Sequence, residues 1–65
     1  MKIVLNGAAR EIAAANLDQA MNELGYTDGS IATAVNGTFI PKARRQSQLL
    51  DDGDRIEVVA PMQGG

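Results

Sequence analysis

Two Asn-Gly dipeptides constrain the fold of this chain more than any other feature of its sequence. Asn6-Gly7 separates the short apolar run 2–5 from the segment 8–12, and Asn36-Gly37 separates residues 31–35 from residues 38–40. A two-residue type I′ turn needs a positive φ at both central residues, which Asn and Gly tolerate. The sequence therefore predicts two β-hairpins, one over residues 2–12 and one over residues 31–40.

One amphipathic helix is predicted between the hairpins, over residues 17–24. Asn16 is placed to cap the helix, Gln19 follows three residues later as in a capping box, and Gly25 is suited to the residue after its end. Four apolar residues recur at the spacing of a single helical face: Leu17, Ala20, Met21 and Leu24.

The last strand is predicted over residues 55–60, where apolar and polar residues alternate, after a loop with one short helical turn over 43–50. A helix that follows a hairpin can bury its apolar face only against the sheet, and the crossover allows the last strand to run parallel to the first. The expected fold is α+β, a ubiquitin-like β-grasp with a mixed sheet of four to five strands on one main helix. The domain is expected to span residues 1–60, with 61–65 as a flexible tail. The helical face is expected to pack on the inward strand residues: Ile3, Leu5, Ile56 and Val58.

Composition excludes several classes of protein. The 65 residues include no Cys and no His, so a disulfide framework, a zinc finger and the commonest general base are all ruled out. A net charge of −2 argues against nucleic-acid binding, and the apolar runs are too short to span a membrane. Asp51, Asp52 and Asp54 lack the spacing of a calcium loop and predict a turn. We therefore expect a cytoplasmic protein that is not an enzyme and holds no metal.

The Gly64-Gly65 pair ends the sequence and is separated from the best strand by only three residues. Two glycines make a thin tail that can enter a narrow site and adopt backbone angles that other residues avoid. A carboxylate is a poor electrophile, so an enzyme has to activate it, for example as an acyl-adenylate. The tail is therefore a candidate substrate for such an enzyme, and the alternative is a frayed end without function.

Three segments together resemble the ThiS family of sulfur carrier proteins of thiazole (thiamine) biosynthesis. They are AVNGTFIPK over residues 34–42, the Asp-Gly-Asp turn at 52–54 and RIEVVAPMQGG over 55–65. The resemblance implies that a ThiF-type enzyme adenylates the Gly65 carboxylate with ATP and Mg, while the chain itself binds no cofactor. It also implies conversion to a thiocarboxylate, with sulfur from a cysteine desulfurase system, and delivery of that sulfur to thiazole synthase.

Other functions remain compatible with the same residues. The small subunit of molybdopterin synthase is similar in fold and tail, so sulfur transfer to molybdopterin is one alternative. A ubiquitin-like interaction module without carboxyl chemistry is another, and a modifier conjugated to lysines is a third. The sequence also departs from the family at Lys42, where Arg is common, and in the residues that follow it.

A partner-binding surface is predicted on the sheet face opposite the helix. Val4 and Val59 alternate against the inward residues, so they are expected to meet there, with Phe39 close by. In the tail, Met62 and Gln63 are expected to contact the same partner. The basic cluster Lys42, Arg44 and Arg45 is expected to be a solvated loop, and the alternative is docking to an acidic partner.

Overall fold

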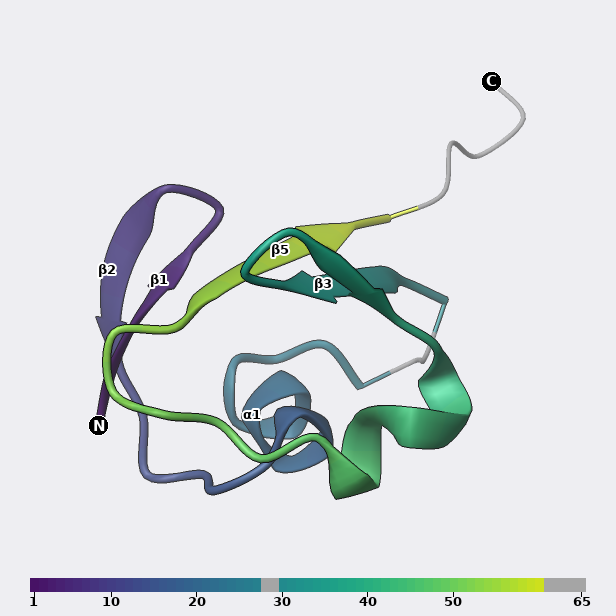
Figure 1. The fold of residues 1–65 in the computed structure, drawn as a ribbon, viewed down its shortest axis with the longest axis horizontal. Coiled ribbons are helices and arrows are strands. Elements are labelled where there is room, and N and C mark those ends of the chain that lie inside the picture. The colour runs from purple at the N-terminus through teal and green to yellow at the C-terminus, as the bar shows by residue number, and fades with distance from the viewer. Residues whose placement is uncertain (28–29, 61–65) are drawn as a thin grey trace.

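The computed structural model describes residues 1–27 and 30–60, which form a five-stranded mixed sheet packed on one α-helix (Figure 1). The predicted β-grasp architecture is confirmed. The elements in chain order are β1 (Lys2–Leu5), β2 (Ala8–Glu11), α1 (Leu17–Glu23), β3 (Ala32–Val35), β4 (Thr38–Ile40), the 3₁₀ helix η1 (Lys42–Ser47) and β5 (Arg55–Val59).

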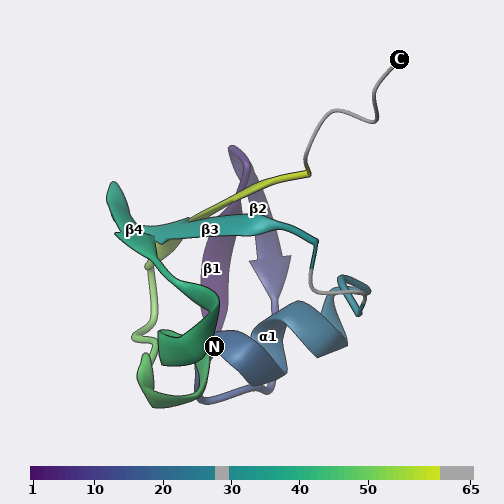
Figure 2. The same ribbon diagram turned by 90° about the vertical axis from the view of Figure 1, so that its right-hand side faces the viewer.

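The first and last strands lie side by side in the middle of the sheet. The strand order is β2-β1-β5-β3-β4, with β1 parallel to β5 and all other neighbours antiparallel. Both helices lie on one side of the sheet, as Figure 2 shows, and the other face of the described sheet is open. Residues that point away from the helices are therefore available to a partner.

Both Asn-Gly dipeptides form the predicted turns. Asn6 and Gly7 have φ values of 47° and 86°, and Asn36 and Gly37 have 51° and 85°. Positive φ at both central positions is the signature of the type I′ turn, whose twist matches that of the strands it joins. Each hairpin is thus set by two adjacent residues.

Helix α1 begins where its capping residue predicts. The Asn16 Oδ1 atom accepts a hydrogen bond from the Gln19 backbone N–H at 2.8 Å. Gly25 has a φ of 96°, the left-handed conformation that often follows a helix end. The helix ends at Glu23, one residue earlier than expected, because Leu24 is its C-terminal cap.

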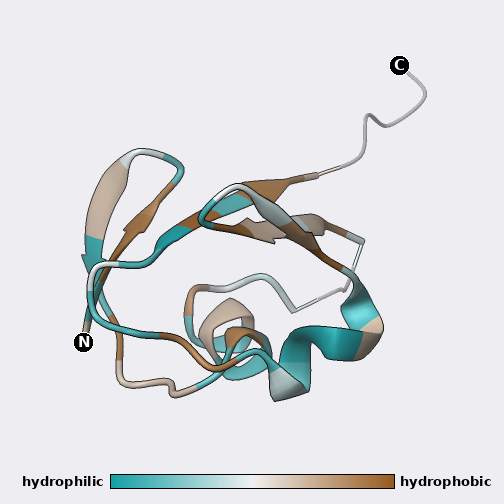
Figure 3. Cartoon of the chain, viewed as in Figure 1, coloured by the Kyte–Doolittle hydropathy of each residue, from teal (hydrophilic) through white to brown (hydrophobic). Residues whose placement is uncertain are grey.

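The core lies between α1 and the sheet, as the matched apolar patterns predict. Leu17, Ile3 and Ile56 are fully buried, and Leu24 is only half-buried because it caps the helix end. Figure 3 shows β5 alternating between hydrophilic and hydrophobic residues, whereas η1 is mostly hydrophilic. The buried apolar residues are Ile3, Leu5, Ile12, Ala14, Leu17, Ala20, Met21, Val35, Ile40, Leu50, Ile56 and Val58.

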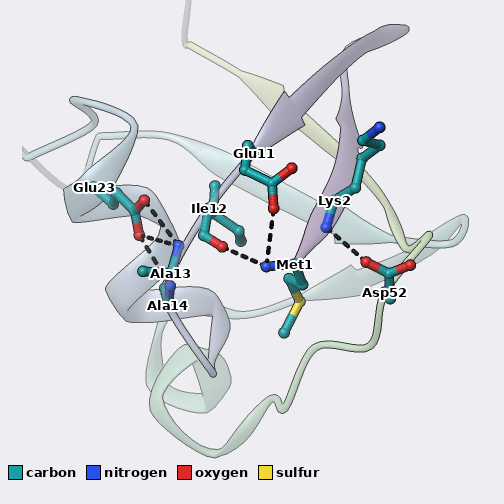
Figure 4. A network of polar contacts seen from close by, with 8 residues as sticks. All are labelled: Met1, Lys2, Glu11, Ile12, Ala13, Ala14, Glu23 and Asp52. Atoms are coloured by element: carbon teal, nitrogen blue, oxygen red, sulfur yellow. Dashed lines mark hydrogen bonds and ion pairs between the residues drawn. The ribbon is translucent and has the colours of Figure 1, made fainter.

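Two carboxylates accept hydrogen bonds from backbone N–H groups of neighbouring segments (Figure 4). Glu23, at the end of α1, accepts hydrogen bonds from the backbone N–H groups of Ala13 and Ala14 at 3.0–3.1 Å. The Asp52 Oδ1 atom accepts from the Lys2 N–H at 2.7 Å, which ties the turn before β5 to the start of β1. The acidic segment 51–54 is thus a turn, as predicted, in which the Asp52 and Asp54 carboxylates accept hydrogen bonds from backbone N–H groups.

Candidate functional site

An exposed apolar surface of the sheet lies near the C-terminal end of β5. Phe39 and Val59 are each 64% exposed, although both are large apolar residues in strands. Across the sheet, Phe39 pairs with Ala34 and Val59 pairs with Ala32. The small alanines between the two larger side chains leave a shallow hollow. We call this surface the Phe39–Val59 patch, lined by Ala32, Thr33, Ala34, Phe39, Glu57 and Val59.

Val4 does not belong to this patch, so the expectation that Val4 and Val59 meet is wrong. The two strands are adjacent, but their register pairs Val4 with Arg55, four residues before Val59. Arg55 and Glu57 are exposed on β5 between the two valines. Val4 is half-buried and lines a separate hollow beside Arg55. Adjacency of the end strands could be predicted, but their register could not.

Arg45 contradicts both interpretations of the basic cluster. Lys42 and Arg44 are exposed, as a solvated loop requires, but Arg45 is only 4% exposed. Its Nε donates to the Thr33 Oγ1 at 3.2 Å and its Nη2 donates to the Ile31 carbonyl at 2.5 Å. Arg45 therefore joins η1 to strand β3. The sequence around it, KARRQS, does not distinguish it from its exposed neighbour.

Arg45→Ala is expected to lower the free energy of unfolding by about 2 kcal/mol or more, because buried hydrogen bonds from a charged donor are lost. The Thr33 hydroxyl would still donate to the Ile40 carbonyl, but the Ile31 carbonyl would lose its partner. Arg44→Ala is the matched control and is expected to change stability by less than about 0.5 kcal/mol. Urea denaturation of both variants measures the difference, and equal midpoints would contradict the structural role of Arg45.

The two turn asparagines have a second role that the sequence analysis missed. The Asn6 side chain bonds to both backbone polar groups of Val58, and the Asn36 Oδ1 accepts from the Arg55 N–H at 3.0 Å. The two hairpins thus hold β5 at both ends. A signal was present in the sequence, because Asn recurs at both turns where Asp or Gly would also satisfy the backbone.

The predicted tail residues Met62, Gln63, Gly64 and Gly65 lie outside the described residues. The described chain ends at Ala60, directly after β5. The Phe39–Val59 patch therefore borders the point from which the chain continues toward the Gly-Gly pair. Within residues 1–27 and 30–60, no group of three or more acidic side chains is placed to hold a metal ion. No helix in the same residues has the length and apolar content to cross a membrane.

The sheet order and single packed helix define a protein of the β-grasp class. Two solved structures of a thiamine biosynthesis protein (ThiS) from Geobacter metallireducens share the fold. The crystal structure aligns with a TM-score of 0.83 at 22% identity and covers 100% of both chains. The NMR structure gives 0.80 at 22% identity and is covered over 88% of its length.

Sequence comparison then identifies the family. The ThiS family model matches residues 3–65. The sulfur carrier protein ThiS of Thermus thermophilus is 34% identical over 61 residues, which cover 94% of this chain and 95% of that protein. This chain belongs to the ThiS family. A thiazole synthase of Paramagnetospirillum magneticum is 33% identical over 66 residues, and this chain spans 20% of its length.

Proposed function

We propose that this protein carries sulfur as a thiocarboxylate on the Gly65 carboxyl group, for use in making the thiazole ring of thiamine. The observation that carries the proposal is the ThiS family match, which extends through the final two glycines. The curated ThiS relative supports the same role over 94% of the chain. The chain is then a protein substrate of its partners rather than a catalyst.

The proposed reaction begins with activation of the carboxylate in the cytoplasm. A Gly65 carboxylate oxygen attacks the α-phosphorus of ATP, bound with Mg on a ThiF-type enzyme, and pyrophosphate leaves. A persulfide sulfur, supplied by a cysteine desulfurase system, then attacks the acyl carbon and AMP leaves. A thiol cleaves the resulting S–S bond, which forms a disulfide on the sulfur donor and leaves a thiocarboxylate on Gly65.

We propose thiazole synthase as the acceptor of the sulfur. A segment similar to this whole chain lies within a protein named thiazole synthase, of which it makes up 20%. Two functions joined in one polypeptide in one organism are often carried by interacting proteins in another. This relative therefore favours thiazole over molybdopterin as the destination.

ATP–pyrophosphate exchange with a ThiF-type enzyme tests the activation step. Wild-type protein is expected to support exchange that depends on both proteins. Intact mass after addition of the sulfur donor is expected to show replacement of one oxygen by sulfur. An interaction module without carboxyl chemistry would bind the enzyme but give neither signal, and a lysine modifier would give an isopeptide adduct instead.

We further propose that the Phe39–Val59 patch docks on the adenylating enzyme. Val59→Asp places a charge in this patch and is expected to raise the KM for the carrier about tenfold or more, since central apolar contacts dominate interface energy. Because Val59 is 64% exposed, the melting temperature is expected to stay near that of the wild type.

The matched control is Ala9→Asp. Ala9 is exposed and pairs with Val4, and its strand β2 is the far edge of the sheet. The Ala9→Asp substitution therefore adds the same charge outside the patch. The control is expected to leave the KM nearly unchanged. Equal KM values for the two variants would exclude the patch as the docking surface.

A further inference from the structure

Strand β5 has unequal partners on its two sides. Strand β3 pairs with it as far as Val59, which lies opposite Ala32. Strand β1 pairs with it only at Arg55 and Ile56, because the chain then turns back at Asn6-Gly7. The last backbone bond on this side runs from the Asn6 N–H to the Ile56 carbonyl at 2.9 Å. Val58 therefore faces a side where the strand has ended.

The Asn6 side chain takes the place of the missing strand. Its Oδ1 accepts from the Val58 N–H at 2.9 Å and its Nδ2 donates to the Val58 carbonyl at 3.2 Å. One side-chain amide thus satisfies both polar groups of one residue, as a peptide group of a neighbouring strand would. We call this pair of hydrogen bonds the Asn6 clamp.

We infer that Asn6 is a positioning residue that fixes the root of the Gly-Gly tail. The clamp holds β5 two residues before Ala60, where the described chain ends, and β3 holds the other side at Val59. Together they hold the end of β5 from both sides. This inference rests on the proposed function, in which the Gly65 carboxylate has to reach ATP while the Phe39–Val59 patch is docked.

The clamp requires an amide side chain, because Val58 presents both a donor and an acceptor. An amide carries both a donor and an acceptor, whereas a carboxylate at neutral pH only accepts. Asn6→Asp would keep the bond from the Val58 N–H but set a negative oxygen against the Val58 carbonyl. Asn6→Gly would remove both bonds. Gly and Asp both suit a type I′ turn, so both variants spare the hairpin and test the clamp alone.

The second hairpin provides a matched control. Asn36 has the same neighbour, Gly37, and a similar φ, and its Oδ1 accepts from the Arg55 N–H at 3.0 Å. It therefore holds the opposite end of β5, away from the tail. Asn36→Gly removes a side-chain amide from the same type of turn, and that amide is also bonded to β5.

The test measures amide hydrogen exchange and adenylation for the two Gly variants and for Asn6→Asp, below the melting temperature of each. Asn6→Gly is expected to expose the Val58 amide, and Asn36→Gly the Arg55 amide. Asn6→Gly is expected to lower kcat for pyrophosphate exchange about tenfold or more, because misplacing a reacting group slows the reaction. Its KM is expected to change little, since the docking patch is intact. Asn6→Asp is expected to lower kcat as well, and Asn36→Gly to leave it near wild type.

Three other outcomes would contradict, in turn, the positioning role of Asn6, the clamp and the proposed function. Equal kcat values for Asn6→Gly and Asn36→Gly would show that Asn6 contributes only stability, and would overturn the inference. An unchanged exchange rate of the Val58 amide in Asn6→Gly would overturn the clamp itself. If wild-type protein supports no pyrophosphate exchange, the proposed function fails, and the Val58 amide still decides whether the clamp exists.

Discussion

Deletion of Gly65 is expected to abolish ATP–pyrophosphate exchange by the adenylating enzyme while leaving the melting temperature unchanged. The deletion moves the terminal carboxylate back by one residue, so that a docked domain would present it short of the α-phosphorus. Among the described residues, the buried core runs from Ile3 to Val58, and the deletion removes none of its side chains. Exchange at the wild-type rate would exclude the carrier function for this carboxylate.

Gly64→Val keeps the length of the tail and changes its width. A branched side chain at this position restricts the backbone and broadens a segment that has to enter the active site of the enzyme. Exchange is expected to fall about 100-fold, the size of effect that a small misplacement of a reacting group produces. Arg10→Gln, a change on the exposed edge strand β2 outside the Phe39–Val59 patch, is a suitable control and should retain most of the activity.

Leu17→Ala is expected to have the largest effect on stability, about 2–5 kcal/mol in the free energy of unfolding. Leu17 is fully buried at the first turn of α1, against the sheet. A domain of this size has little stability to spare, so the variant is expected to be partly unfolded at growth temperature. Thermal melting followed by circular dichroism measures the loss.

Leu24→Ala is the matched comparison on the same helical face. Leu24 is half-buried at the C-cap, so removing its side chain leaves a smaller cavity and should cost less than the change at Leu17. If the two variants melt at the same temperature, the assignment of Leu17 to the centre of the core is wrong.

Local features of the fold followed from the sequence because a few adjacent residues encode each of them. The Asn-Gly turns depend on two residues with positive φ, and the start of α1 depends on Asn16 and the N–H of Gln19. The alternation along β5 distinguishes its buried residues from its exposed ones without reference to other strands. The exposure of Phe39 and Val59 was predictable on the same grounds.

The candidate site was predictable only in part, because its arrangement depends on contacts between distant residues. The register of β1 on β5 separates Val4 from Val59, and a shift that brought them together would break the hydrogen bonds between those strands. Arg45 is buried because the chain folds η1 against β3, which places an acceptor 14 residues away beside its guanidinium.

Asn6 combines one feature that adjacent residues determine with one that only the tertiary fold determines. That Asn6 forms a turn is determined by its own backbone and by Gly7. That its side chain holds Val58, 52 residues along the chain, is determined only when β1 and β5 come together and β1 ends at Leu5, opposite Ile56 and two residues before Val58. The physical reason is that a turn depends on local dihedral angles, whereas the partner of a side-chain amide depends on which backbone groups the tertiary fold leaves unpaired.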